Sequence, residues 1–310
     1  MIRVPCRAQF RTFSLIVNIA LRRIHRQATQ PNPINNLLML SLPLTIPEWP
    51  FLKKQNSVYY KYWNNNTDEI IDYADDLYKN QKYIEVYENL NRLKYMNNPE
   101  ILWRIARALY KLSCTPDLPS SISNLMILEA VDVVNHALSV GNDNANVHKW
   151  TAIILDCKYN MEGIKAKING LETIRYHITK AVELDETQTA LYHMLGKLAY
   201  DLASLNWFQR KLANVLFEEP PSGSYEVAYD CFLKAEQSTP GFYVGNLVML
   251  GKSAIKLGRL QQAKYFLQLA SHYIPMTEED KKLKLEAKTL SHTLDELNKD
   301  ILPKAEDELQ

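Results

Sequence analysis

The feature that most constrains the fold of this chain is a short sequence that occurs twice. The residues MLGK stand at positions 194–197 and again at 249–252. Small residues and a proline then follow Gly251 at distances of 12, 19 and 24 residues: Ala263, Ala270 and Pro275. Small side chains at such distances allow two antiparallel helices to approach closely, and a proline ends the second helix. The chain is therefore expected to contain a repeated pair of helices.

This spacing is typical of the tetratricopeptide unit, a helix–turn–helix repeat with a period of about 34 residues. Such units stack into a solenoid whose concave surface binds other molecules. The pattern therefore favours a binding protein over an enzyme.

The helical apolar period continues from Thr67 onward, and we predict an all-α, tetratricopeptide-like helical-repeat solenoid over residues 67–299. About five helix pairs and a capping helix are expected, followed by a C-terminal tail at 300–310. The predicted elements are 68–79 with 82–96, 99–113 with 122–139, helices around Ala152 and Ile178, a pair from Tyr192 to Pro240, a pair from Leu247 to Pro275, and a last helix from Thr277 to about Asn298.

The fourth helix pair contains an insertion. The two MLGK copies lie 55 residues apart, whereas a bare repeat would separate them by about 34. The roughly 21 additional residues lie around 205–223 and read LNWFQRKLANVLFEEPPSG. Their apolar side chains include Trp207, Phe208 and Leu212, and two prolines end the segment. We predict either a short helix packed on the solenoid or a lid over one end of its groove.

The first 30 residues differ in charge from the rest of the chain. They contain no lysine, aspartate or glutamate, but they contain six arginines: Arg3, Arg7, Arg11, Arg22, Arg23 and Arg26. Arginine-rich segments without acids are typical of mitochondrial transit peptides, so a mitochondrial location is predicted. A basic disordered tail and a secretory signal are the alternatives. Five prolines within residues 31–66 indicate a linker.

Several classes of function are disfavoured by the composition. Without the six arginines the net charge changes from +1 to −5, so nucleic-acid binding through bulk electrostatics is not expected. No phosphate-binding glycine loop, nucleophile elbow or metalloprotease motif occurs. The four cysteines form no pair at metal-binding spacing: Cys6, Cys114, Cys157 and Cys231. We therefore predict a protein that is not an enzyme and that uses no cofactor and no metal.

Candidate binding residues follow from the repeat frame. The first helix of each pair lines the concave surface, and the residues directly after and three before its small residue face the groove. These positions predict a partner-binding groove of Trp103, Arg107, Lys149, His193, Lys197 and Lys252. Arg107, Lys197 and Lys252 share one repeat position, which predicts a basic stripe for an acidic peptide or a phospholipid headgroup. The alternatives are solvated basic residues without a ligand and a Trp103 that belongs to the core.

Several stretches resemble the regulator of microtubule dynamics family over about residues 68–295: ILWRIARALYKLS, VHKWTAIILD, LYHMLGKLAYDLASLNWFQRKLANVLFEEPPSGSYEVA and FYVGNLVMLGKSAIKLG. The segment NWFQRKLANVLFEEPP is the most distinctive, because generic repeat proteins lack it. The resemblance implies association with microtubules and tubulin, no enzyme activity, and a cytoplasmic, cytoskeletal or spindle-pole location as the alternative to mitochondria. It leaves the oligomeric state open.

Overall fold

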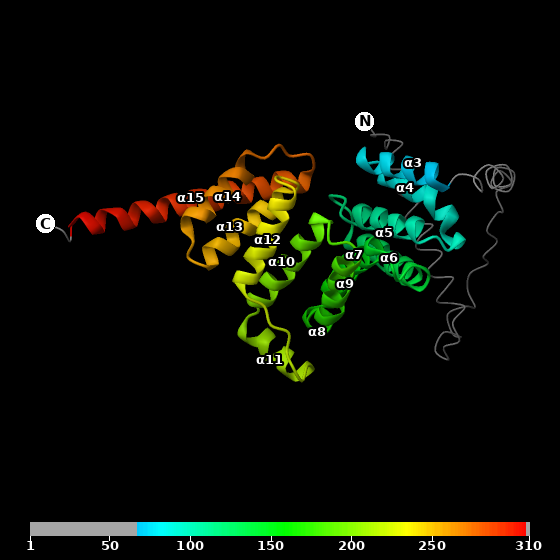
Figure 1. Ribbon diagram of the computed structural model, residues 1–310, viewed down its shortest axis with the longest axis horizontal. Helices are drawn as coiled ribbons and strands as arrows, with labels where there is room; N and C mark the ends of the chain where they lie inside the picture. The colour runs from blue at the N-terminus through cyan, green and yellow to red at the C-terminus, as the bar shows by residue number, and fades with distance from the viewer. Residues whose placement is uncertain (1–66, 308–310) are drawn as a thin grey trace, which may run out of the picture. The chain divides into compact units, whose positions relative to one another are not determined.

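The computed structural model describes residues 67–307, and the predictions for residues 1–30 and 31–66 lie outside the described residues. Within the described part, every regular element is a helix (Figure 1). The elements are α3 (Thr67–Lys79), α4 (Tyr83–Leu90), the 3-10 helix η2 (Asn91–Met96), α5 (Pro99–Ser113), α6 (Ser120–Val140), α7 (Ala145–Glu162), α8 (Ile164–Asn169), α9 (Leu171–Leu184), α10 (Thr189–Ala203), α11 (Trp207–Leu216), α12 (Tyr225–Ser238), α13 (Val244–Lys256), α14 (Leu260–His272) and α15 (Glu278–Asp307).

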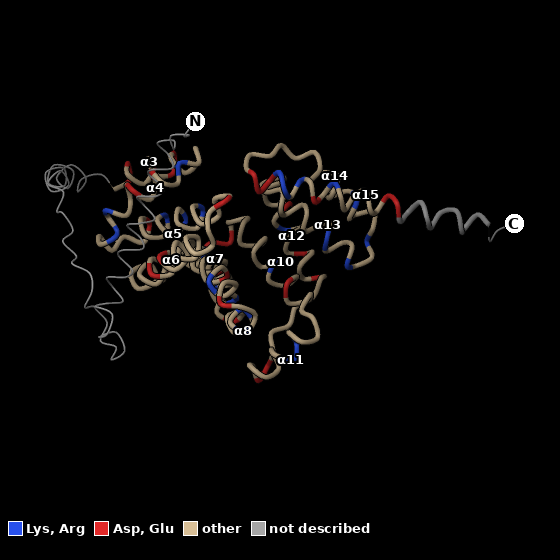
Figure 2. The backbone as a smooth tube through the Cα atoms, turned by 180° about the vertical axis from the view of Figure 1, so that it is seen from behind, with Lys and Arg blue, Asp and Glu red and all other residues tan. Residues whose placement is uncertain are grey.

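Local sequence signals explain where these helices begin. The side chain of Asn98 accepts a hydrogen bond from the backbone of Glu100 at 2.9 Å, with Pro99 at the first helical position of α5. Asn144 caps α7 in the same way. These side chains satisfy backbone N–H groups that have no partner inside the helix. Acidic and basic residues are interspersed along the helices (Figure 2).

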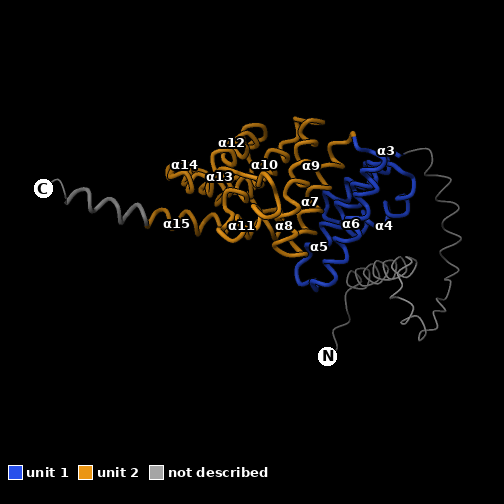
Figure 3. Tube along the Cα trace, turned by 90° about the horizontal axis from the view of Figure 1, so that it is seen from below, with its two compact units in different colours: residues 1–142 blue, residues 143–310 orange. Residues whose placement is uncertain are grey.

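The helices divide between two compact units, coloured separately in Figure 3, and the repeat pattern did not predict this division. The described part of the first unit contains α3 to α6, and the second unit contains α7 to α15. The predicted pairs are confirmed within each unit, because α3 packs on α4, α5 on α6, α7 on α9, α10 on α12, and α13 on α14. The predicted helix 82–96 is divided into α4 and the 3-10 helix η2.

The glycines of the two MLGK copies lie where paired helices approach closely. A Cβ atom on Gly196 would lie 2.8 Å from the ring of Phe232 in the partner helix α12. A Cβ atom on Gly251 would lie 2.6 Å from the Cγ atom of Leu267 in α14. Both distances are shorter than a carbon–carbon contact, so a Cβ atom at either position would force the neighbouring side chain to shift.

Two helices lie outside the regular pairs. The predicted insertion forms α11, a short helix that ends before the two prolines. It packs on α8, a second extra helix that follows α7 and that the sequence pattern did not predict. The two helices share a small core whose buried members are Ile168, Leu171, Leu202 and Ala213.

Helix α15 is longer than predicted. It begins near the expected position but continues to Asp307, past Asn298 and into the predicted tail. It packs on α13 and α14, and it runs past their ends in Figure 1. The pattern does not stop at Asn298, because apolar residues recur at alternating spacings of three and four across this point: Leu290, Leu294, Leu297 and Ile301.

A pair of histidines is buried between α7 and α9. The Nδ1 atoms of His148 and His177 lie 2.9 Å apart, so one ring donates a hydrogen bond and the other accepts it. Burial, and then the neighbouring His148, lower the pKa of His177 from 6.5 to about 4. An additional proton on this neutral pair would place a charge in the helix interface, where burial disfavours it.

We therefore predict that acid destabilises the second unit through this pair. The unfolded chain binds a proton at His177 near pH 6.5 and the folded chain only near pH 4, so stability is lost as the pH falls between these values. The loss between pH 7 and pH 4.5 is expected to be about 2 kcal/mol. Urea unfolding monitored by circular dichroism should show an acid-dependent loss that is smaller by this amount in His177→Phe than in the wild type. A His292→Gln variant, altered at an exposed histidine, should keep the full loss, and an unchanged loss in His177→Phe would contradict the prediction.

Candidate partner-binding surfaces

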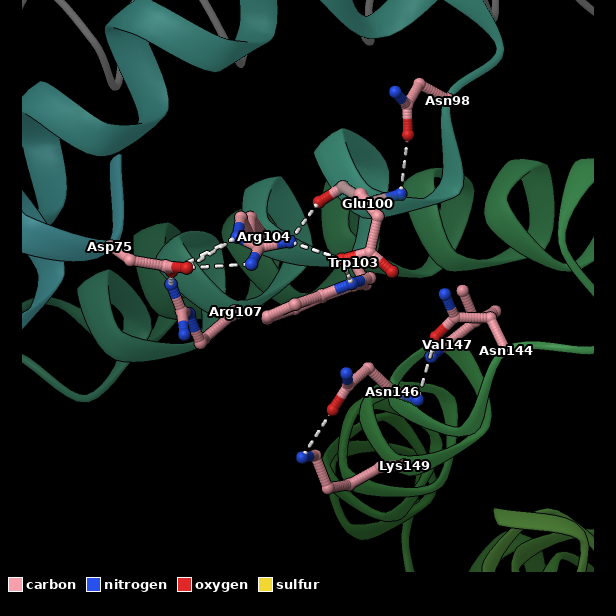
Figure 4. Close-up of polar contacts among 10 residues, drawn as sticks. All are labelled: Asp75, Asn98, Glu100, Trp103, Arg104, Arg107, Asn144, Asn146, Val147 and Lys149. Atoms are coloured by element: carbon pink, nitrogen blue, oxygen red, sulfur yellow. Dashed lines mark hydrogen bonds and ion pairs between the residues drawn. The ribbon is translucent and has the colours of Figure 1, made fainter. Parts of the chain in front are cut away.

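In the first unit, four side chains stack one on another. The guanidinium of Arg107 lies 3.7 Å from the ring centre of Tyr78 and 4.9 Å from that of Trp103. The guanidinium of Arg104 lies 4.0 Å from the same Trp103 ring (Figure 4). Cations over aromatic faces are attracted electrostatically, and the attraction grows when water is excluded.

Two carboxylates neutralise this stack. Asp75 of α3 accepts hydrogen bonds from Arg104, at 2.7 Å from Nη2, and from Arg107, at 2.5 Å from Nη2. Glu100 accepts from Arg104 Nη1 at 2.5 Å and from the indole nitrogen of Trp103 at 2.9 Å. Burial alone would raise the pKa of Asp75, but the bonds and charges of Arg104 and Arg107 together hold it below its ordinary value.

The first unit therefore uses Trp103 and Arg107 mainly within its own core. Trp103 is buried, and only 12 % of the Arg107 side chain is exposed. The Nε atom of Arg107 is buried without a hydrogen-bond partner. An acidic ligand would have to displace Asp75 to reach this guanidinium.

In the second unit, Lys197 and Lys252 belong to a more open surface. Lys197 pairs with Asp201 one turn further along α10, at 2.7 Å, and 52 % of its side chain is exposed. Lys252 of α13 pairs with Glu286 of α15. Burial, then Tyr225, Asp201 and Glu286, raise the pKa of Tyr200.

The carboxylates of the two pairs, Asp201 and Glu286, thus both act on one tyrosine, Tyr200. The ring of Tyr225 meets Tyr200 edge to face at 5.2 Å. We call the group Lys197, Tyr200, Asp201, Lys252 and Glu286 the lysine–tyrosine surface. It combines two cations, the two carboxylates paired with them, a hydroxyl and an aromatic ring. The cations and the hydroxyl can bind an incoming carboxylate by charge and hydrogen bonds when it replaces their present partners.

The remaining two groove residues are tied to neighbouring polar groups. The ammonium group of Lys149 donates to Asn146 at 2.7 Å, drawn in Figure 4, and to Gln188 at 2.5 Å. His193 bonds through Nδ1 to the buried amide of Asn246 at 3.0 Å, and burial lowers its pKa. The rings of Phe232 and Tyr243 surround it. Burial therefore favours the neutral form of His193, which links α10 to α13 through Asn246.

The residues predicted for the insertion have separate roles. Leu212 packs on the core shared with α8. Trp207 and Phe208 instead lie on the outer side of α11 and are largely exposed.

Sequence reasoning missed the acidic partners of the predicted cations. Asp201 was recognisable, because it follows Lys197 by four residues and lies on the same face of the helix. Arg104 was also recognisable, because it lies one turn before Arg107. Asp75 and Glu286 carried no local signal, since they are 32 and 34 residues away from the cations that they neutralise.

Two other kinds of site have no candidate in the described part of the chain. Among residues 67–307, no group of three or more histidine, cysteine, aspartate or glutamate side chains is arranged to hold a metal ion. In the same part of the chain, no helix is both long and apolar enough to cross a membrane.

The paired helices and their close-packed glycines define a tetratricopeptide-like helical-repeat protein. A thermophilic TPR protein from Thermus thermophilus has a similar fold, with a TM-score of 0.52 and 14% sequence identity over 72% of this chain and 97% of that protein. The model of the family "Regulator of microtubule dynamics protein 1-3" matches residues 70–295. The chain belongs to the regulator of microtubule dynamics family.

Individual relatives agree with this assignment. Regulator of microtubule dynamics protein 1 from Pongo abelii is 36% identical over 231 residues, which are 74% of each protein. The Mus musculus protein 1 is 36% identical over 72% of this chain and 73% of its own length. Regulator of microtubule dynamics protein 3 from Xenopus laevis is 35% identical over 62% of this chain and 41% of its own length. Proteins of this family and fold class are typically not enzymes.

The stacked arginines lead to a stability prediction. Asp75→Asn should lower the free energy of unfolding by about 3 kcal/mol, because it leaves two largely buried guanidinium groups without their shared carboxylate. Asp76→Asn removes the adjacent carboxylate, which is 73% exposed and lies 3.7 Å from Lys79, and should cost less than about 0.5 kcal/mol. Urea unfolding of both variants tests this comparison. Equal effects would show that Asp75 does not stabilise the packing of α3 on α5.

Proposed function

We propose that this chain is a non-enzymatic binding protein that associates with microtubules and regulates their dynamics or the organisation of the spindle. Its membership of the regulator of microtubule dynamics family supports this function. The helical-repeat fold supports binding rather than catalysis, because stacked repeats present an extended surface to a partner.

The lysine–tyrosine surface is our candidate for the contact with tubulin. Its ligand would be an acidic peptide segment such as the tails of tubulin. Lys197 and Lys252 are more exposed than Arg107, whose side chain is enclosed by Tyr78, Trp103 and Asp75. An incoming carboxylate can therefore reach the two lysines without opening a core.

The internal ion pairs of this surface do not prevent such exchange. Surface ion pairs contribute only about 0–1 kcal/mol, because water screens them and both side chains lose freedom. A peptide with several carboxylates can replace Asp201 and Glu286 as the partner of both lysines at once. Its second contact then forms intramolecularly, which raises the overall affinity.

This mechanism predicts a loss of microtubule binding after charge reversal. Lys197→Glu/Lys252→Glu should bind microtubules at least about tenfold more weakly in co-sedimentation, because acidic side chains would face an acidic tail. Removing the tubulin tails should weaken the wild type to a similar extent. Circular dichroism of the variant checks that its helices remain folded.

The matched control is Lys282→Glu/Lys288→Glu, which makes the same charge change at two exposed lysines of α15. We expect it to bind as the wild type does. Equal wild-type binding to intact and tailless microtubules would overturn the proposed contact. Absence of binding to either would overturn the microtubule association itself.

Residues 1–30 support a second proposal, in which the protein acts at mitochondria or at organelle contact sites by binding a phospholipid or protein. Their six arginines and lack of acids favour mitochondrial targeting. Residues 1–40 fused to a fluorescent reporter should direct it to mitochondria, and replacing Arg11, Arg22, Arg23 and Arg26 by glutamine should make it diffuse. Diffuse signal from the unaltered fusion would contradict this proposal and favour the cytoplasm, cytoskeleton or spindle pole.

A further inference from the structure

The two helices outside the regular pairs form a small separate layer on the second unit. Helices α8 and α11 come from different repeats but pack on each other. Figure 1 shows both at the same edge of the unit. Their shared core includes Ile168 from α8 and Ala213 from α11. The layer is therefore a fixed part of the second unit.

Helix α11 is apolar on its outer side as well as on its inner side. Ala213 faces inward and is buried, whereas Trp207, Phe208 and Val215 are 70%, 60% and 82% exposed. Residues 207, 211 and 215 lie on one face because they are four apart, and residue 208 borders that face. Exposed aromatic side chains clustered on one face indicate an interaction surface.

A cation lies within this apolar face. The ammonium group of Lys211 is 4.3 Å from the ring centre of Trp207. Neither α8 nor α11 contains an acidic residue, and α8 adds Lys165 and Lys167. Glu218 and Glu219 follow the end of α11. Figure 2 shows basic positions on both helices.

The helix is fixed before any partner arrives. The side chain of Asn206 accepts from the backbone of Gln209 and the side chain of Gln209 accepts from the backbone of Asn206, both at 2.9 Å. Arg210 donates to the backbone carbonyl groups of Leu205 and Ala203, also at 2.9 Å. These bonds anchor the first turn, so Trp207 and Phe208 extend from a preformed helix.

We propose that the outer face of α11 docks on the surface of an anionic phospholipid bilayer. Tryptophan and phenylalanine with a neighbouring lysine are the residues of interfacial helices, in which the rings enter the headgroup region and the long cationic side chain reaches the phosphates. Lys165 and Lys167 add attraction to the anionic surface. Because Glu218 and Glu219 offset part of this charge, insertion of the aromatic rings is the main source of affinity.

The test must report on Trp207 itself, because the six arginines of residues 1–30 also attract anionic lipids. The full chain is mixed with vesicles of phosphatidylcholine and phosphatidylserine that carry brominated acyl chains, which quench tryptophan emission on contact. The difference between the wild type and Trp207→Phe isolates the Trp207 signal. We expect this difference to be quenched by the brominated vesicles.

Affinity provides a second measurement. Phe208→Ala/Val215→Ala should weaken vesicle binding at least about tenfold, because both side chains lose their burial in the interface. The matched control Tyr265→Ala/Leu269→Ala removes two exposed apolar side chains from α14 of the same unit and should stay within about twofold of the wild type. Both pairs are exposed, so neither should unfold the chain.

Either measurement can overturn the proposal. An unquenched Trp207, or equal effects of the two variant pairs, would show that α11 does not contact the bilayer. If Trp207 is not quenched and Phe208→Ala/Val215→Ala instead loses binding to a defined protein partner, the face is a protein-docking surface. These results are independent of the microtubule contact, since Lys197 and Lys252 are unchanged in every variant.

Discussion

The close approach of paired helices at two glycines is the constraint on which the second unit depends. Gly196 faces Phe232, and Gly251 faces Leu267, at distances that leave no space for a methyl group. The close pairing of the helices also determines the direction of the side chain that follows each glycine. Lys197 and Lys252 directly follow these glycines in the sequence, so their side chains lie beside the contact between the paired helices and not within it. They can therefore pair with carboxylates, as they do with Asp201 and Glu286. One short sequence therefore specifies both a packing contact and a polar surface.

The regular part of the fold was predictable because its signals are local. Small residues at repeat spacing, helix caps and prolines identified the helix pairs, and α5 agrees with its predicted range of 99–113. Helix α8 was missed because a helix of six residues is too short to show a clear apolar period. The division into two units was missed for another reason, since it depends on which helices pack together rather than on where each helix begins.

The candidate surfaces were predictable only in part. The repeat frame identified Lys197, Lys252 and Arg107, but it could not distinguish an exposed cation from an enclosed one. That difference depends on distant carboxylates and rings, such as Asp75 from α3 and Glu286 from α15. A repeat position specifies the direction in which a side chain leaves its helix, whereas its surroundings depend on the neighbouring helices. Equivalent positions therefore have different roles in the two units.

The same argument explains why the insertion can carry a function of its own. Residues within the repeats must satisfy the helix–helix contacts, which is why Arg104 and His193 are held by internal hydrogen bonds. Helix α11 meets that requirement with one side only, through Leu212 and Ala213. Its other side is free of packing requirements, yet it carries Trp207, Phe208 and Val215. Exposed apolar side chains add little to the stability of the fold. A bilayer that covers them, as proposed above, would bury this apolar area on a rigid, capped helix.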